Sequence, residues 1–146
     1  MINDQNIIDL TNAAALAGYN INPVELTLLT WNAGFDTHVP IALPVGHSAV
    51  YIFKHQENYL KVGQAGINSA ARYLSHHYYT SAPSTLARSL QMDNFYINLI
   101  NGANFRTWIR QNTTRYNILI PEQHGIHFVN FAEAYFILHC NPRFER

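Results

Sequence analysis

Two short runs of strand-forming residues constrain the fold of this chain more than any other feature. The first run covers residues 48–53 (SAVYIF) and the second covers residues 58–63 (NYLKVG), with the polar residues of 54–58 between them. β-Branched and aromatic residues on both sides of a short polar segment predict a β-hairpin.

The expected register of this hairpin brings two functional side chains together. Pairing Phe53 with Tyr59 closes a five-residue loop and places Tyr51 directly opposite Lys61. Because side chains alternate along a strand, Tyr51 and Lys61 then share one face. The remaining apolar side chains are expected on the other face: Val50, Ile52, Leu60 and Val62.

Helical periodicity is present before the hairpin. One helix is capped by Asp4 or Asn6 and ends near Gly18. A second helix follows Asn22, with Pro23 at its first position. The first 47 residues are therefore expected to form a helical extension that packs on a domain covering the remainder of the chain, 48–146.

Loop and helix signals lie on either side of the hairpin. Proline and glycine mark residues 34–47 as a loop. After the hairpin, Asn68 can cap a helix over 69–78. On such a helix Arg72 and His76, four residues apart, lie on one face.

The C-terminal half adds further helices and one strand. Short helices are expected at 86–92 and 105–112, and a strand at 116–120 stopped by the following proline. Asn130 is expected to cap a last helix that carries Glu133. The predicted class is α+β, or mixed α/β: a small sheet with helices around it.

The charges are distributed unevenly, although the chain has nine Lys and Arg against nine Asp and Glu and a net charge of zero. Residues 1–57 hold five acids and one lysine, a balance of −4. Residues 58–146 hold eight cations and four acids, a balance of +4, and seven of those cations are arginine. Arginine forks onto phosphate oxygens, so the second part can bind phosphate. An ordinary arginine-bearing surface explains the same charges.

Several other classes of protein are disfavoured. Cys140 is the only cysteine, which excludes an intramolecular disulfide, and its apolar neighbours indicate a buried thiol. No run of about 18 apolar residues is present, so no membrane span is expected. The first residues lack the basic region of a signal peptide, and a cytoplasmic protein is the expectation. The sequence has no phosphate-binding Gly-x-x-x-x-Gly-Lys loop and no Gly-x-Ser-x-Gly nucleophile elbow.

Four sequence elements, in order, resemble the GIY-YIG endonuclease family. Residues 49–51 (AVY), followed ten residues later by 61–63 (KVG), look like the two-strand signature of the family. Arg72 and His76 fall where the family has its helix arginine and, in many members, a histidine or tyrosine one turn later. Residues 131–144 look like the metal-binding glutamate helix with its Asn-Pro tail. The similarity covers about residues 48–145, some two-thirds of the chain.

Three residues depart from the family pattern. Ala49 replaces the first glycine, and Lys61 replaces the second signature tyrosine, as in some restriction-enzyme members of the family. Glu145 stands where the family usually has an asparagine. The resemblance still implies a small, mainly antiparallel three-stranded sheet flanked by helices, and a metal-dependent cut in DNA.

The residue chemistry suits phosphodiester hydrolysis. Glu133 offers a hard carboxylate to Mg²⁺ or Mn²⁺, and Arg72 can grip the phosphate and balance its developing charge. Tyr51 can take the proton from the attacking water, and a facing Lys61 ammonium would lower the pKa of the phenol. His76 is a second candidate base or proton relay.

Each of these residues also has a purely structural explanation. Glu133, three residues after Asn130, would fit a capping box, and Tyr51 in a strand can be simply part of the core. Lys61 can be a solvated strand cation. Arg72 and His76 can be surface groups. None of these explanations accounts for their common order along the chain.

Two functions therefore stand at this point. The first is an active endonuclease that acts on DNA, with RNA not excluded. It would be a monomer or a homodimer, and no association with a membrane is expected. The second is a catalytically impaired nucleic-acid-binding or partner-recruiting module of the same fold.

Overall fold

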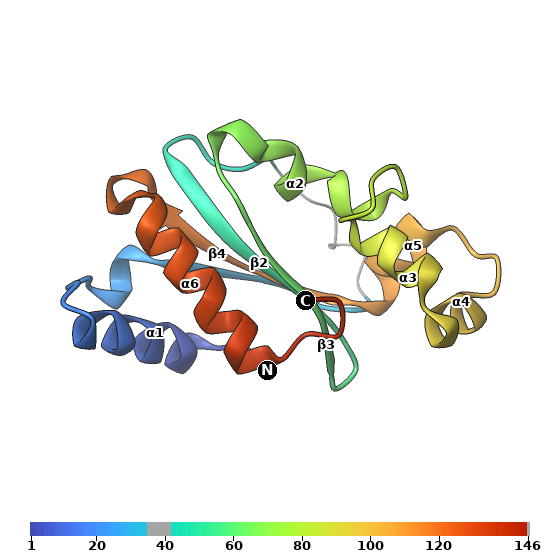
Figure 1. The fold of residues 1–146 in the computed structure, drawn as a ribbon, viewed down its shortest axis with the longest axis horizontal. Helices are drawn as coiled ribbons and strands as arrows, with labels where there is room; N and C mark the ends of the chain where they lie inside the picture. The colour runs from blue at the N-terminus through green and yellow to red at the C-terminus, as the bar shows by residue number, and fades with distance from the viewer. Residues whose placement is uncertain (35–41, 146) are drawn as a thin grey trace.

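A four-stranded antiparallel sheet forms the centre of the molecule, in the order β1-β4-β2-β3 (Figure 1). Its strands are β1 (Thr27–Trp31), β2 (His47–His55), β3 (Asn58–Ala65) and β4 (Thr114–Pro121). The structure, a computed structural model, describes residues 1–34 and 42–145. Residues 35–41 of the loop predicted at 34–47 thus lie outside the described residues. The predicted α+β class is confirmed, with four strands in place of three.

Helices cover both faces of this sheet (Figure 1). The helices are α1 (Asp4–Leu16), α2 (Ala70–Leu74), α3 (Leu86–Met92), α4 (Asn94–Ile100), α5 (Phe105–Asn112) and α6 (Gly125–Cys140). Single 3-10 turns are η1 (Pro23–Glu25), η2 (Ile67–Ser69), η3 (His76–Tyr78) and η4 (Glu122–His124). Among the described residues no helix is long and apolar enough to cross a membrane.

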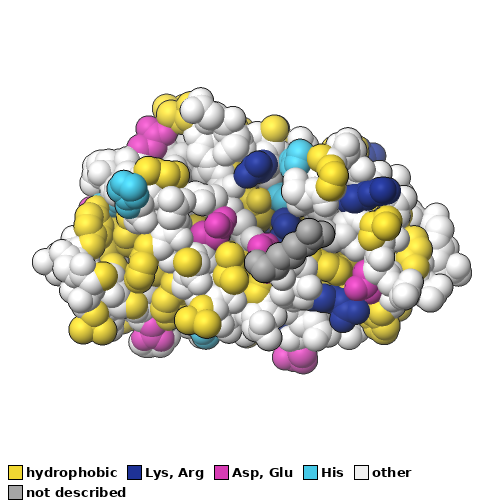
Figure 2. Space-filling view, in the orientation of Figure 1, with side chains coloured by type: hydrophobic (Ala, Val, Ile, Leu, Met, Phe, Trp, Pro, Cys, Tyr) yellow, Lys and Arg dark blue, Asp and Glu magenta, His cyan; other side chains and the backbone are white. Residues whose placement is uncertain are grey.

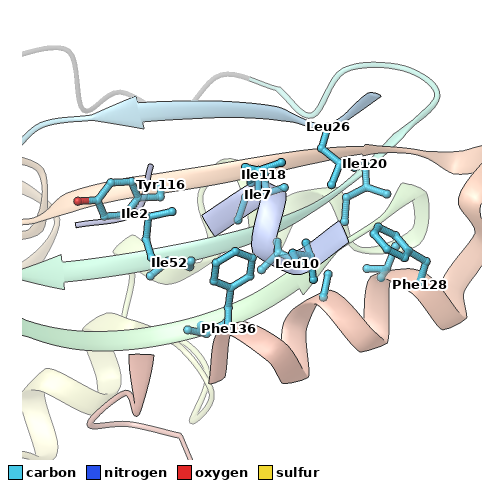
Figure 3. Close-up of a cluster of buried hydrophobic side chains, with 14 of the residues drawn as sticks. Ile2, Ile7, Leu10, Leu26, Ile52, Tyr116, Ile118, Ile120, Phe128 and Phe136 are labelled. Atoms are coloured by element: carbon cyan, nitrogen blue, oxygen red, sulfur yellow. The ribbon is translucent and has the colours of Figure 1, made fainter. Parts of the chain in front are cut away.

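The first face of the sheet packs against α1 and α6, which lie side by side (Figure 1). Alternate side chains of the strands, such as Ile52 and Ile118, meet Leu10 of α1 and Phe136 of α6 in one buried cluster (Figure 3). Cys140 at the end of α6 belongs to this cluster, as the predicted buried thiol requires. Burial raises the pKa of its thiol to about 12, so the thiol stays protonated.

The second face packs against the segment that runs from α2 to α5. Tyr51 and Phe53 of β2 contribute to a second buried cluster. The helical segment adds aromatic and aliphatic side chains to it: Tyr73, Tyr78, Leu86, Ala87, Leu90, Tyr96, Ile100 and Ile109. The sheet is therefore the middle of three layers.

The second helix predicted in the first 47 residues is wrong. Asn22 caps only the 3-10 turn η1, through a capping box with Glu25. The chain then becomes extended and β1 pairs with β4, from Thr27 opposite Leu119 to Trp31 opposite Arg115. Threonine and tryptophan favour strands, and the edge of β4 was available for pairing. The segment therefore forms a strand, although the spacing of its apolar residues predicted a helix.

The β2–β3 hairpin is confirmed, but its register differs from the prediction. The loop has two residues, because His55 pairs with Asn58 and Gln56 takes a positive φ of 51°. The register shifts at Phe53, which faces Lys61 and leaves Leu60 as an extra residue. Leu60 therefore belongs to the second face, with Tyr51, and not to the first face.

The helix predicted over 69–78 is interrupted. The Gly66 N–H donates a 2.9 Å hydrogen bond to the Ser69 hydroxyl, and the chain then passes through η2 into α2, which ends at Leu74. Ser75 has φ −140° and ψ −22°, which breaks the helix before η3 begins. The predicted one-turn relation between Arg72 and His76 is thus lost at this break.

Helix α6 begins earlier than predicted. It starts at Gly125, so Asn130 lies inside the helix and does not cap it. The capping-box explanation of Glu133 is therefore wrong. The end of α6 is as predicted, because Asn141 takes a left-handed conformation and Pro142 follows it.

Candidate active site

Tyr51 lies at the middle of β2, with only 2% of its surface exposed. It pairs with Gly63 of the edge strand β3 in place of Lys61. The phenol ring lies across this glycine, so closely that a Cβ at Gly63 would collide with the Tyr51 hydroxyl. The glycine therefore allows the phenol to reach toward the β3 edge of the sheet.

His77 holds the hydroxyl of Tyr51. The His77 Nε2 atom lies 2.6 Å from the Tyr51 hydroxyl oxygen. On the other side of the ring, Nδ1 accepts a hydrogen bond of 3.1 Å from the backbone N–H of Leu86. Because Nδ1 is an acceptor, the proton of the neutral ring is on Nε2, which donates to Tyr51. The phenol keeps its own proton for another acceptor.

Burial and charge fix the ionisation of this pair. The pKa of His77 is well below its usual value because the ring is buried and because Lys61, Arg115 and Arg72 are near. His77 is therefore neutral. Burial also raises the pKa of Tyr51, and the positive charges of Arg115 and Arg72 act in the opposite direction.

Lys61 occupies a different place from the one predicted. It faces Phe53, and its ammonium forms an ion pair of 3.5 Å with Glu145. The same carboxylate accepts a 3.3 Å hydrogen bond from the N–H of Val62. The expected direct lowering of the Tyr51 pKa by a facing Lys61 is therefore wrong. The Lys61 ammonium pairs with Glu145, and its charge also lowers the pKa of His77 and of Glu133.

Glu133 approaches this group of residues from α6 and is half-buried. Its pKa is raised first by burial and then by the nearby carboxylate of Glu145. A hydrogen bond from the Gln64 side chain and the charges of Lys61 and Arg72 lower the pKa in part. Because α2 and α6 both contact β3, Arg72 and Glu133 reach the β3 edge from opposite faces of the sheet.

The donor chemistry at Glu133 fits a hard divalent cation. A second carboxylate raises the Glu133 pKa, and a cation between two such oxygens would relieve that repulsion. Within 1–34 and 42–145 no group of three or more His, Cys, Asp or Glu is placed to hold a metal ion. A bound Mg²⁺ would therefore depend on Glu133, with water and phosphate oxygens as further ligands.

Arg72 is exposed on α2 and borders a hollow of about 380 Å³. Gln64 and Ser48 of the sheet also line this hollow, as do Asn68 of η2 and Ile126 of α6. Arg72 donates no hydrogen bond and forms no ion pair with any described residue. The guanidinium is therefore free to bind an anion that enters the hollow.

A buried arginine lies under the site. Arg115 of β4 is fully buried, and its guanidinium carbon lies 4.9–5.9 Å from the ring centres of five aromatic side chains: Trp31, Tyr51, Phe53, Tyr73 and Tyr78. It donates hydrogen bonds to the Tyr78 hydroxyl, the Tyr73 carbonyl and the Asn117 side-chain oxygen. No carboxylate of the described residues is within ion-pair distance of it.

The structure therefore brings most of the predicted residues to one place. Tyr51, Arg72 and Glu133 influence one another electrostatically at the β3 edge, and Lys61 belongs to the same group. His76 is half-buried, with its ring edge-on to His77 at 5.6 Å, and His77 takes the contact with Tyr51.

Sequence reasoning missed the roles of His77 and Arg115. The adjacent histidines could not be told apart without the helix break at Ser75. Arg115 does carry a signal, since it alternates with Asn117 on the same face of a β-strand. That pattern shows two polar side chains aimed into the sheet face that carries Tyr51.

Comparisons with known proteins give no further assignment. No family model matches the chain, and no significant match was found among curated proteins or solved structures. Any functional class for this protein must therefore be argued from its own fold and residues.

Proposed function

We propose that this chain is a metal-dependent endonuclease that hydrolyses phosphodiester bonds in DNA. The observation that carries the proposal is the meeting of Tyr51, Arg72 and Glu133 at one sheet edge from three different elements. A general base, a phosphate-binding cation and a metal-binding carboxylate are the groups that this hydrolysis needs.

Tyr51 is the proposed base. The Tyr51 phenol first gives its proton to solvent. The phenolate oxygen then takes a proton from a water molecule, the water oxygen forms a bond to phosphorus, and the bond to the leaving oxygen breaks. The leaving oxygen takes a proton from solvent. His77 is a positioning residue, because its Nε2–H donates to the Tyr51 oxygen and stabilises the phenolate.

Arg72 and Glu133 serve the phosphate. The exposed Arg72 guanidinium can form two hydrogen bonds with phosphate oxygens and offset the charge that develops on them. Glu133 would hold Mg²⁺ or Mn²⁺, and the ion would neutralise phosphate charge and make its bound water more acidic. The ion pair between Lys61 and Glu145 keeps the Glu145 carboxylate in place beside Glu133.

A second function is favoured by one specific observation. Tyr51 is almost wholly buried and burial raises its pKa, both of which work against a base that must meet water. A catalytically impaired module that binds nucleic acid or recruits a partner would retain the same fold without requiring an exposed phenolate.

Metal-dependent nicking of supercoiled plasmid separates the two functions. We expect nicking with Mg²⁺ or Mn²⁺ that EDTA stops. Glu133→Gln should abolish it, while Glu122→Gln, which removes an exposed carboxylate of η4, should not. Nicking that persists in Glu133→Gln or in excess EDTA would contradict the metal assignment. Binding of plasmid without any nicking would favour the second function.

A further inference from the structure

The arginines of the described residues are confined to one part of the molecule. Helices α1 and α6 and strand β1 contain no lysine or arginine. Helices α2, α3 and α5 contain Arg72, Arg88, Arg106 and Arg110, and no helix from α2 to α5 contains an acid. Figure 2 shows Lys and Arg side chains at the centre of the visible face and over the half that holds α2 to α5, whereas hydrophobic side chains are visible on both halves.

These arginines are held by neutral groups. Arg106 donates a 2.8 Å hydrogen bond to the Tyr79 hydroxyl, and its guanidinium carbon lies 5.5 Å from the centre of that ring. Arg110 lies 5.5 Å from the centre of the Tyr78 ring. Neither arginine forms an ion pair with a described residue. The tyrosines orient the guanidinium groups without neutralising their charge.

The two arginines are close to the proposed active site in the fold. Arg106 and Arg110 are four residues apart on α5, so they lie on one face of the helix, where like charges repel. The tyrosines that hold them belong to η3 and to the residue after it. This segment directly follows α2, which carries Arg72, and α5 contacts η3.

Retaining adjacent like charges without acids costs stability, and a polyanion would offset that cost. We propose that Arg106 and Arg110 bind the phosphates of duplex DNA beside the cut, extending the contact that begins at Arg72. The DNA would thus cross α2 and α5, pass Glu133 of α6 at the cut, and leave α1 uncovered. This inference rests on the proposed function for the identity of the polyanion.

The salt dependence of DNA binding tests the inference without any cleavage. The probe is a fluorescein-labelled DNA duplex, titrated with the whole chain in EDTA and followed by fluorescence anisotropy between about 50 and 200 mM salt. Each phosphate contact contributes about 0.9 to the slope of log affinity against log salt. Arg106→Gln and Arg110→Gln should therefore each flatten the slope by about 0.9. Arg106→Lys should retain it.

Arg143→Gln is the matched control, because it removes an exposed arginine that is already paired with Asp93 at 2.9 Å. Its slope should equal that of the parent chain. Wild-type slopes in both α5 variants, or an equal flattening in Arg143→Gln, would overturn the inference. Thermal unfolding of each variant identifies any that misfold. If a glutamine variant misfolds, the salt slope of the folded Arg106→Lys variant still tests the inference. Plasmid nicking in Mg²⁺ is measured separately. A chain that does not cut but shows these slopes would contradict the proposed nuclease activity and still support the DNA-binding surface on α5.

Discussion

Gly63 matters for the site because of the side chain that lies over it. Alanine at this position would place its Cβ against the Tyr51 hydroxyl. We expect Gly63→Ala to lower the free energy of unfolding by about 1–3 kcal/mol, as overpacking does, and to displace the phenol and slow cleavage. Gly66→Ala is the control, since its Cβ would meet only the Ser48 hydroxyl at 3.5 Å. Urea unfolding of both variants decides the matter. Equal stability of the two variants would show that the phenol moves freely.

The hydrogen bond from His77 to Tyr51 predicts a change in pH dependence. His77→Leu removes the donor that stabilises the phenolate, so the pKa of Tyr51 should rise further. Because the base acts when deprotonated, the rate should then fall at neutral pH and recover only at higher pH. Tyr51→Phe should lower the rate by roughly 10²–10⁴-fold at every pH. Single-turnover cleavage against pH measures both. A profile that moves in His76→Leu and not in His77→Leu would contradict the structural assignment.

The ion pair of Lys61 and Glu145 allows a prediction about the pKa of Glu133. Lys61→Met removes a cation that lowers the pKa of Glu133 and leaves Glu145 unpaired, so the Glu133 pKa should rise. Glu145→Gln should lower it, because the neighbouring negative charge is lost. Carboxyl carbon NMR titration of the metal-free chain follows both changes. Shifts of the same sign in the two variants would show that charge is not the cause.

At the scale of elements, local patterns predicted more than long-range pairings did. The α3, α5 and β4 regions and the hairpin were predicted, because periodicity and turn residues are local properties. Strand β1 was missed, since its extended form depends on pairing with β4, some 90 residues away. The hairpin register was also missed, because the bulge at Phe53 depends on burying Leu60 beneath the helices of the second face.

Arg115 links two elements, and this link is testable. Its guanidinium joins β4 to the segment of α2 and η3 through the Tyr73 carbonyl and the Tyr78 hydroxyl. Arg115→Met should destabilise the chain by about 1–3 kcal/mol for each buried group left without a partner. Arg115→Lys should not restore stability, because an ammonium lacks the planar fork of donors. Chemical unfolding measures the loss. Arg88→Gln on α3, where Gln91 is the one hydrogen-bond partner of the guanidinium within residues 1–34 and 42–145, should change stability by less than about 0.5 kcal/mol.

At the scale of the whole molecule, both faces of the sheet contribute a buried core, and the helical arginines lie on the second face. Sequence order brought Tyr51, Arg72 and Glu133 into one hypothesis, and the three-layer fold explains how they can meet. Helix α6 carries Glu133 over the β3 edge from the first face, and α2 carries Arg72 from the second. The charges divide in the structure by layer and not by sequence half. Helices α2 to α5 carry four arginines, whereas α1 and α6 carry no Lys or Arg, although α6 belongs to the part of the sequence with a balance of +4.

This division predicts the role of α1. Leu10 is fully buried between α1, the sheet and α6, whereas Leu16 at the end of the same helix is 92% exposed. Leu10→Ala should therefore lower the free energy of unfolding by about 2–5 kcal/mol, through lost burial and the cavity left behind. Leu16→Ala should change it by less than about 0.5 kcal/mol.

Neither substitution touches the proposed DNA surface, so both folded variants should bind duplex DNA with the salt slope of the parent chain. Urea unfolding gives the first quantity and fluorescence anisotropy in EDTA gives the second. A flatter slope in Leu10→Ala, measured below its unfolding transition, would mean that α1 supports the DNA contact after all. An unchanged stability in Leu10→Ala would mean that α1 does not pack on the sheet in solution. The helix is expected to stabilise the fold because its buried side chains complete the first core, while its lack of cations keeps it out of the phosphate contact.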